Sequence, residues 1–230
     1  CTILFGYVLA RIALIPTKNA LVAEKQFIGN VAHEIRTPLS IIRANSEILL
    51  YEKKHSPDAT AMITSNIEEL DRISGIIYNL LTLNSFRIID HINFESVDFN
   101  LIARDSIEKL RTLAGKKGIT VKVQESNVPL FVWGNKNGLA QITTNLIKNA
   151  IIYTQPNGSV QVSTKPLSNS SIEFVVSDTG IGIEQTKLRR IFEPFYQVDP
   201  SRSQGKGSNG LGLAIVSELV KLHHGKITIE

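Results

Sequence analysis

Cysteine, methionine and tryptophan each occur only once in the 230 residues. With Cys1 as the only thiol, the chain can form neither an internal disulfide nor a cysteine-based metal site. The formal net charge is only +4, and no run of lysine and arginine is dense enough to indicate a nucleic-acid partner. These shortages exclude a disulfide-stapled scaffold and a basic nucleic-acid-binding protein, while the 43% hydrophobic content is typical of a globular protein.

The N-terminal apolar run is too short, as it stands, to cross a membrane. It covers residues 1–10 and ends at Arg11, whereas a full span needs roughly 20 apolar residues. One interpretation is a buried helix end. We favour the alternative that residues 1–16 are the cytoplasmic end of a truncated transmembrane helix, because Arg11, Lys18 and Lys25 follow it as basic residues follow a span on the cytoplasmic side. We therefore expect an inner or plasma membrane protein whose remaining residues lie in the cytoplasm.

Two long helical patterns follow, over residues 18–51 and 58–85, separated by a polar turn. Each carries one apolar stripe with spacings of mostly three and four residues. The stripe residues are Leu21, Phe27, Ile28, Val31, Ile35, Leu39, Ile42, Leu49 and Leu50 in the first, and Ile63, Ile67, Leu70, Ile73, Ile77, Leu80 and Leu81 in the second. Two antiparallel helices cannot bury both stripes alone, so we expect residues 17–86 to form a homodimeric four-helix bundle. Packing of the hairpin on its own neighbouring domain is the alternative.

The pattern changes to mixed helices and strands beyond an expected linker at residues 86–96. We expect helices at residues 99–114, 139–153 and 211–223, a short helix and loop at 184–202, strands at 119–123 and 130–133, paired strands at 160–164 and 172–177, and a last strand from residue 225. This pattern predicts a separate α/β domain over residues 97–230.

His33 begins the run His33-Glu-Ile-Arg-Thr-Pro38 within the first helix. An imidazole is largely neutral near pH 7 and can attack phosphorus. Glu34 is adjacent and can hold the proton of one ring nitrogen, leaving the other nitrogen free. Thr37, one helical turn from His33, can place a water molecule against a phosphorylated imidazole. A lone histidine on a helix is more often a surface or packing residue, so this interpretation depends on the motifs that follow.

Asn145 and Asn149 are four residues apart and therefore share one face of the helix expected there. Amide oxygens suit Mg²⁺, although two amides alone would be read as surface residues.

Asp178-Thr-Gly180-Ile-Gly182 follows an apolar strand, where we expect the carboxylate to be a buried acceptor for an exocyclic amine. The two glycines would let backbone approach a ring. Taken alone, this motif is equally compatible with a plain hairpin.

Gly210-Leu211-Gly212 opens the last predicted helix, so the free N–H groups of that helix form an anion site suited to phosphates. The glycine-rich, polar residues 201–209, which include Lys206, indicate a mobile lid over a nucleotide. Phe192 and Phe195 precede that stretch and are either core residues or anchors for the lid.

Taken in order, these stretches resemble the H box (residues 33–38), N box (145–149), G1 box (178–182), F box (192–195) and G2 box (210–213) of sensor histidine kinases of bacterial two-component systems. The resemblance extends from about Leu21 to Lys226. It implies an α+β chain of two domains, in which a dimeric helical hairpin precedes an α/β two-layer sandwich of the Bergerat fold. It further implies that the chain uses ATP and Mg²⁺ to phosphorylate His33. The phosphoryl group would pass to an aspartate in the receiver domain of a response regulator, with phosphatase activity toward that partner.

The resemblance also implies roles for single residues. Glu34 would be the base for autophosphorylation, and Glu34 with Thr37 would support dephosphorylation of the partner. Asn149 would bind the metal, and Asp178 would recognise the adenine amine. The other residues implied in nucleotide binding are Asn145, Tyr153, Gly180, Gly182, Lys206, Gly210, Leu211 and Gly212.

Two positions depart from the family pattern. Ile152 and Gln197 stand where the family commonly has basic residues, which removes possible phosphate contacts; Lys206 and Arg202 are candidate substitutes. A signalling scaffold or phosphatase with weak kinase activity is therefore an alternative. A further alternative, an ATPase-driven conformational clamp, is disfavoured because related ATPases of the gyrase, chaperone and repair types have a water-activating glutamate where this chain has Asn145.

Overall fold

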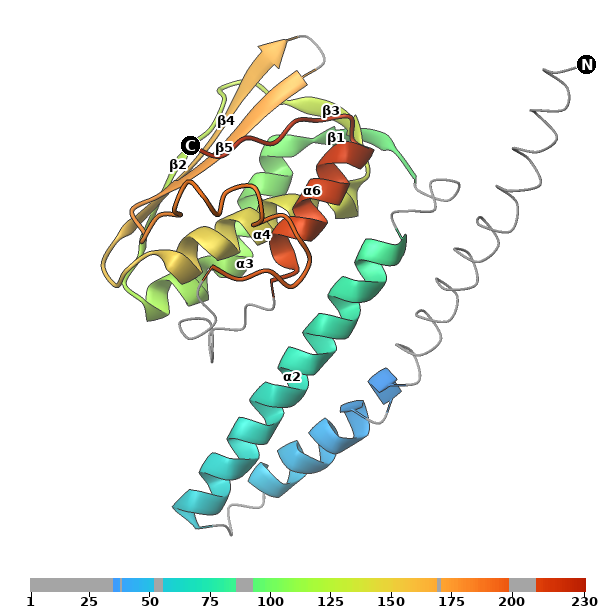
Figure 1. Cartoon of the computed structure of the whole chain (residues 1–230), viewed down its shortest axis with the longest axis vertical. Coiled ribbons are helices and arrows are strands. Elements are labelled where there is room, and N and C mark those ends of the chain that lie inside the picture. Colours follow the sequence, from blue (N-terminus) through green and yellow to red (C-terminus); the bar gives the residue numbers. More distant parts are fainter. Residues whose placement is uncertain (1–34, 38, 52–55, 86–92, 169–170, 199–209) are drawn as a thin grey trace, which may run out of the picture. The chain divides into compact units, whose positions relative to one another are not determined.

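A computed structural model describes residues 35–37, 39–51, 56–85, 93–168, 171–198 and 210–230 (Figure 1). The chain divides into two compact units, residues 1–85 and residues 86–230. The described residues of the first unit form a helical hairpin, and those of the second unit combine helices with two small sheets. The expected fold class, a helical hairpin followed by an α/β domain, is therefore confirmed.

The hairpin of the first unit consists of a helix over residues 35–37 and 39–51 and of helix α2, Pro57–Ser85. Its second helix begins where the sequence provides a cap: the Ser56 hydroxyl accepts a hydrogen bond from the Ala59 N–H at 3.2 Å. Pro57 occupies the first helical position, where its missing N–H costs nothing. The Arg43 guanidinium bonds the Asp71 carboxylate at 2.6 Å, which links the two helices.

The apolar stripe of α2 is less exposed than the rest of that helix, and Leu70 in its middle is only 9% exposed. The partner helix remains much more open, with Ile42 50% and Ile48 59% exposed. Within a single chain the described part of the hairpin therefore leaves much of its apolar surface uncovered.

No helix among the described residues is long and apolar enough to cross a membrane. The membrane segment predicted at residues 1–16 lies outside the described residues.

The strands described in the second unit form two sheets. Strand β1, Glu95–Asp98, pairs antiparallel with β3, Phe131–Gly134. Strand β2, Thr120–Gln124, lies parallel to β4, Ser159–Ser168, and β4 pairs antiparallel with β5, Ser171–Asp178. The predicted pairing of the strands at residues 160–164 and 172–177 is confirmed. Part of β1 falls within the predicted linker at residues 86–96, so that prediction was wrong: four residues are too few to show alternation, and the strand forms because β3 pairs with it.

The described residues of the second unit form three helices (Figure 1): α3, Phe99–Lys116; α4, Lys136–Tyr153; and α6, Gly212–Leu222. Helix α3 packs against β2, α4 packs against β4 and β5, and α6 packs against α4. The Asp98 carboxylate caps α3 and the Asn135 side chain caps α4 by accepting from N–H groups of their first turns. The core lies between α3, α4 and the three-stranded sheet, and its buried residues are Leu110, Ala114, Ile119, Ile147, Ala150, Ile151, Val160 and Val162. Burial of each large apolar side chain contributes about 1.5–3 kcal/mol.

Two further predictions for this unit were wrong. Residues 185–195 form consecutive turns rather than a short helix, with hydrogen bonds that span three residues, such as Lys187 N–H to the Glu184 carbonyl at 2.8 Å. Residues 225–230 show no strand pairing in the structure, and the Gly225 N–H instead bonds the Val220 carbonyl at 2.8 Å. A strand requires a partner backbone, which the sequence pattern by itself does not supply.

Candidate functional site

The two asparagines of the N box lie against the first residue of α6. A β-carbon on Gly212 would be 3.3 Å from the Asn145 side-chain oxygen and 3.8 Å from the Asn149 side-chain nitrogen. The absence of a side chain at Gly212 therefore lets the start of α6 approach both amides. Leu211 occupies the N-cap position and makes no side-chain capping bond. The positive end of α6 thus lies next to two amides, an arrangement suited to a phosphate and its metal.

The G1 box begins at the last residue of β5, Asp178. The Gly180 N–H donates to the Asp178 side-chain oxygen at 2.8 Å, which fixes the turn after the strand. Gly180 forms a backbone bridge with Thr154, and a β-carbon at Gly180 would lie only 2.7 Å from the Tyr153 carbonyl oxygen. No larger residue fits there, so this glycine is required by the close approach of the G1 box to the end of α4. The Asp178 side chain is exposed in this structure, so its expected burial was wrong.

The F box contacts the beginning of the G2 box. The Phe195 N–H donates to the Gly210 carbonyl at 2.9 Å. Gly210 has a φ of +67°, and a β-carbon there would be 2.7 Å from the Phe195 carbonyl carbon, so both its conformation and its surroundings favour glycine. The Phe195 side chain is 59% exposed. The Arg190 guanidinium lies 4.4 Å from the Tyr196 ring centroid, a cation–π contact beside this junction.

The structure therefore brings four predicted boxes together in the second unit, in three pairwise contacts. The N box meets the G2 box at Gly212, the end of the N-box helix meets the G1 box at Gly180, and the F box meets the G2 box at Gly210. Gly182 also adopts a positive φ of 67°, but a side chain there would point into open space. Thr37 lies in the first helix of the hairpin, whereas His33, Glu34 and Lys206 are outside the described residues.

The donor set suits a metal that nucleotide phosphates help to hold. Among the described residues, no group of three or more histidine, cysteine, aspartate or glutamate side chains could bind a metal ion. Amide oxygens from α4 are compatible with Mg²⁺, which takes few protein ligands and completes its shell with phosphate oxygens and water. Two residues after the G1 box, the hydrogen bond from the Thr186 hydroxyl holds the pKa of the Glu184 carboxyl below its ordinary value, and the charge of Lys187 lowers that pKa further.

Two features of the second unit were not anticipated from the sequence. Ile152 is buried, with 7% exposure, so the N-box departure places an apolar side chain in the core. Lys117 was not singled out as functional, yet its ammonium donates to the carbonyls of Ile151, Ile152 and Thr154 at 2.8 Å each. The available signal was a lysine immediately after a helix and before a glycine, which is common at helix ends.

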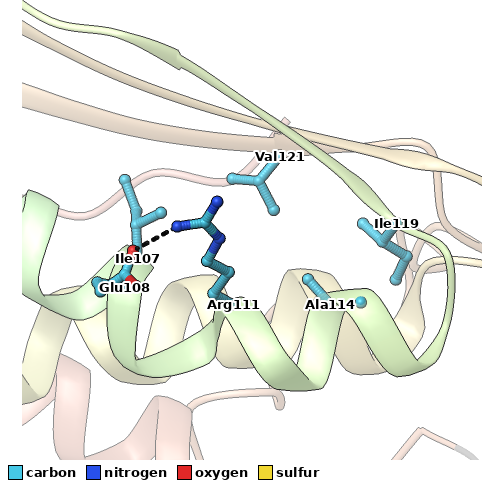
Figure 2. Close-up of a pocket in the computed structure, with 7 residues that line it drawn as sticks. Ile107, Glu108, Arg111, Ala114, Ile119 and Val121 are labelled. Atoms are coloured by element: carbon cyan, nitrogen blue, oxygen red, sulfur yellow. Dashed lines mark hydrogen bonds and ion pairs between the residues drawn. The ribbon is translucent and has the colours of Figure 1, made fainter.

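A separate pocket of about 380 Å³ lies between α3 and β2 (Figure 2). Its lining is mainly apolar, with Ile107, Ala114, Ile119 and Val121 drawn around it. The exposed ion pair of Arg111 with Glu108, 3.4 Å long, crosses its margin. None of the predicted site residues lines this pocket, so it is distinct from the converging boxes.

Comparison with protein families identifies the domain in which the four boxes meet. The family model described as histidine kinase-, DNA gyrase B- and HSP90-like ATPase matches residues 134–230. The second unit therefore contains an ATP-binding domain of that class. The His Kinase A (phospho-acceptor) domain model matches residues 23–87. Because both models match in this order, the chain belongs to the sensor histidine kinases of bacterial two-component systems, as the motif order predicted.

Individual relatives agree with the family. The chain is 34% identical over 226 residues to the sensor histidine kinase RppB of Synechocystis sp., covering 96% of this chain and 49% of that protein. It is 32% identical over 209 residues to the signal transduction histidine-protein kinase ArlS of Staphylococcus haemolyticus, covering 90% of this chain and 46% of that protein. The chain thus spans about half the length of these curated relatives.

Solved structures show the same fold. Full-length ShkA in complex with AMPPNP matches with a TM-score of 0.71 and 27% identity, covering 86% of this chain and 41% of that chain. The mycobacterial sensor histidine kinase MprB matches with a TM-score of 0.51 and 30% identity, covering 57% of this chain and 81% of that chain.

Proposed function

We propose that this chain binds MgATP in its second unit, phosphorylates His33 and passes the phosphoryl group to an aspartate of a response regulator receiver domain. The observation that carries the proposal is the contact at Gly212, where two asparagines on one face of α4 meet the start of α6. A helix N-terminus favours phosphate oxygens, and the adjacent amides favour the metal that accompanies them.

Within this site Asn149 is the proposed metal ligand and Asn145 its neighbour on the same helical face. Bound Mg²⁺ would supply neutralisation of the negative charge on the phosphate oxygens. Asn145 is an amide and therefore a poor base for activating water, so hydrolysis of ATP should be slow and the phosphoryl group retained for transfer. This residue argues against an ATPase-driven clamp.

The nucleotide base is proposed to lie at the G1 box. Asp178 would accept a hydrogen bond from the adenine amine, and the bound adenine would supply the burial that the exposed carboxylate lacks. Gly180, Gly182 and Tyr153 would contact the base, while Lys206, Gly210, Leu211 and Gly212 would contact phosphates. That full-length ShkA was solved with AMPPNP supports a nucleotide site in the shared fold.

In the hairpin, His33 is the proposed phosphoacceptor and Glu34 its general base. Thr37, one turn further along the same helix, would position the water that removes phosphate from the partner regulator. Thr37 lies in a helical segment, residues 35–37, and a helix that also included His33 would place the two side chains on one face. We further propose that the hairpin forms a homodimer, since Ile42 and Ile48 are about half exposed in a single chain, at 50% and 59%.

Residues 1–16 are proposed to anchor the protein in the inner or plasma membrane, with the kinase region in the cytoplasm, because basic residues follow the apolar run.

A phosphatase or scaffold with weak kinase activity is the second candidate function. The burial of Ile152 favours it, because that side chain brings no cation to the phosphates.

The deciding experiment is incubation of the whole chain with γ-labelled ATP and Mg²⁺, followed by acid or base treatment. We expect a label that acid removes and base leaves, as for a phosphohistidine. His33→Gln should abolish it while ATP binding persists, and His55→Gln, outside the motif, serves as the matched control. Equal labelling of His33→Gln and wild type would show that the acceptor is another residue.

A further inference from the structure

Lys117 lies directly after α3, yet its side chain serves the end of another helix. Its ammonium donates to the carbonyl oxygens of Ile151, Ile152 and Thr154, each at 2.8 Å. The last carbonyls of an α-helix have no partner within the helix, and a cation there also complements the negative end of the helix dipole. Lys117 is therefore a cap for the C-terminus of α4, supplied from a different part of the chain.

The backbone on either side of Lys117 is held by the loop that follows α4. The Asn157 N–H donates to the Lys117 carbonyl at 3.1 Å, and the Thr120 N–H donates to the Gly158 carbonyl at 3.0 Å. Gly118 has a φ of +65°, and a β-carbon there would be 2.6 Å from the Asn157 side-chain oxygen. The lysine is thus held at its base by residues 157–158 and at its tip by the end of α4.

The capped segment continues directly into the proposed adenine site. Thr154, one of the three residues whose carbonyl oxygens accept a hydrogen bond from Lys117, forms the backbone bridge with Gly180. The neighbouring Tyr153 carbonyl packs against the α-carbon of Gly180, at 2.7 Å from the position of a β-carbon. Gly180 in turn donates its N–H to the Asp178 carboxylate at 2.8 Å. A continuous set of contacts therefore runs from Lys117 through the end of α4 to Asp178.

We propose that Lys117 is a positioning residue for adenine recognition: by holding the end of α4 it places Gly180, and through it the Asp178 carboxylate, against the base. The inference rests on the proposed role of Asp178. Lys117 does not touch the nucleotide in this scheme. Its loss should therefore weaken the selection of adenine over other bases more than the binding of the phosphates, which depends on Asn145, Asn149 and α6.

The test compares the affinities of the whole chain for ATP and for inosine triphosphate, both with Mg²⁺, by titration calorimetry. Hypoxanthine carries an oxygen where adenine carries its amine, so the ratio of the two dissociation constants measures recognition of that amine. In Lys117→Met we expect this ratio to fall by about tenfold, as when one buried hydrogen bond is lost. The exposed neighbour variant, Lys116→Met, should keep the wild-type ratio.

General destabilisation does not imitate this result, because a smaller folded fraction weakens both affinities by the same factor. Circular dichroism establishes that each variant is folded at the assay temperature, and Lys117→Gln replaces Lys117→Met where the methionine variant unfolds. Wild-type discrimination retained by the folded Lys117 variant would overturn the role of Lys117 alone. Equal affinity of wild type for the two nucleotides would refute the role of Asp178 and this inference with it.

Discussion

Gly212→Ala should lower the affinity of the protein for MgATP while leaving its free energy of unfolding nearly unchanged. Gly212 is the first residue of α6 and has no positive φ, so alanine is conformationally acceptable there. The new methyl group would lie 3.3 Å from the Asn145 side-chain oxygen and 3.8 Å from the Asn149 nitrogen. It would therefore occupy the gap between the two amides and the N-terminus of α6, where we place the metal and phosphates.

The magnitudes follow from these contacts. Alanine in place of a helical glycine stabilises by up to about 0.5–1 kcal/mol. Overpacking costs about 1–3 kcal/mol when neighbours cannot move, but the half-buried Asn145 can shift by the few tenths of an ångström required. The two effects should nearly cancel in the free energy of unfolding. MgATP affinity should fall by about tenfold, or about 1.4 kcal/mol, because the asparagine moves away from its productive position.

The assay pairs urea unfolding, which gives stability, with calorimetric titration of MgATP, which gives affinity. Gly115→Ala in α3 is the matched control, because a β-carbon there meets no heavy atom within 4 Å. It should raise stability by about 0.5–1 kcal/mol and leave the nucleotide affinity unchanged. If Gly212→Ala binds MgATP within twofold of wild type, the N-box and G2-box junction is not the phosphate site and the reasoning fails.

Three further predictions test the remaining parts of the proposal. Asp178→Asn should weaken ATP binding by about 1–3 kcal/mol, because the amide can present a donor to the adenine amine; unchanged affinity in calorimetry would exclude this role. Glu34→Ala should lower self-labelling with γ-labelled ATP, whereas Thr37→Ala should spare it and instead slow dephosphorylation of a purified partner regulator; equal loss of labelling in both variants would contradict the division of roles. Sedimentation should show a dimer at micromolar concentration, with the exposed apolar residues such as Ile48 in its interface; a helical monomer would count against the four-helix bundle.

Local patterns in the sequence were sufficient for much of the fold and for the candidate residues. Asn145 and Asn149 share a face because helix periodicity places residues four apart together, and α4 is a helix as predicted. Strands β4 and β5 could be paired from sequence because they are adjacent runs of strand-forming residues joined by a short Ser- and Asn-rich turn. The order of the motifs identified the family, and the family models agree with it.

What required the tertiary structure were contacts between residues distant in sequence. Strand β1 has only four residues and forms because it pairs with β3, more than thirty residues later. Residues 185–195 form turns with hydrogen bonds that span three residues, and not the short helix that their sequence predicted. Asp178 proved exposed, and Ile152 proved buried, because burial depends on which elements surround a side chain and not on its neighbours in the chain.

The sequence by itself therefore determined the family, the candidate residues and most of the helices and strands, since each depends on short-range periodicity and spacing. Only the tertiary structure decided that Gly212 approaches the two asparagines, that Gly180 meets the end of α4, and that Lys117 caps a helix more than thirty residues away. These approaches arise when the apolar faces of α3, α4 and α6 are buried together with the strands. That packing places particular backbone atoms within hydrogen-bonding distance, which no local pattern encodes.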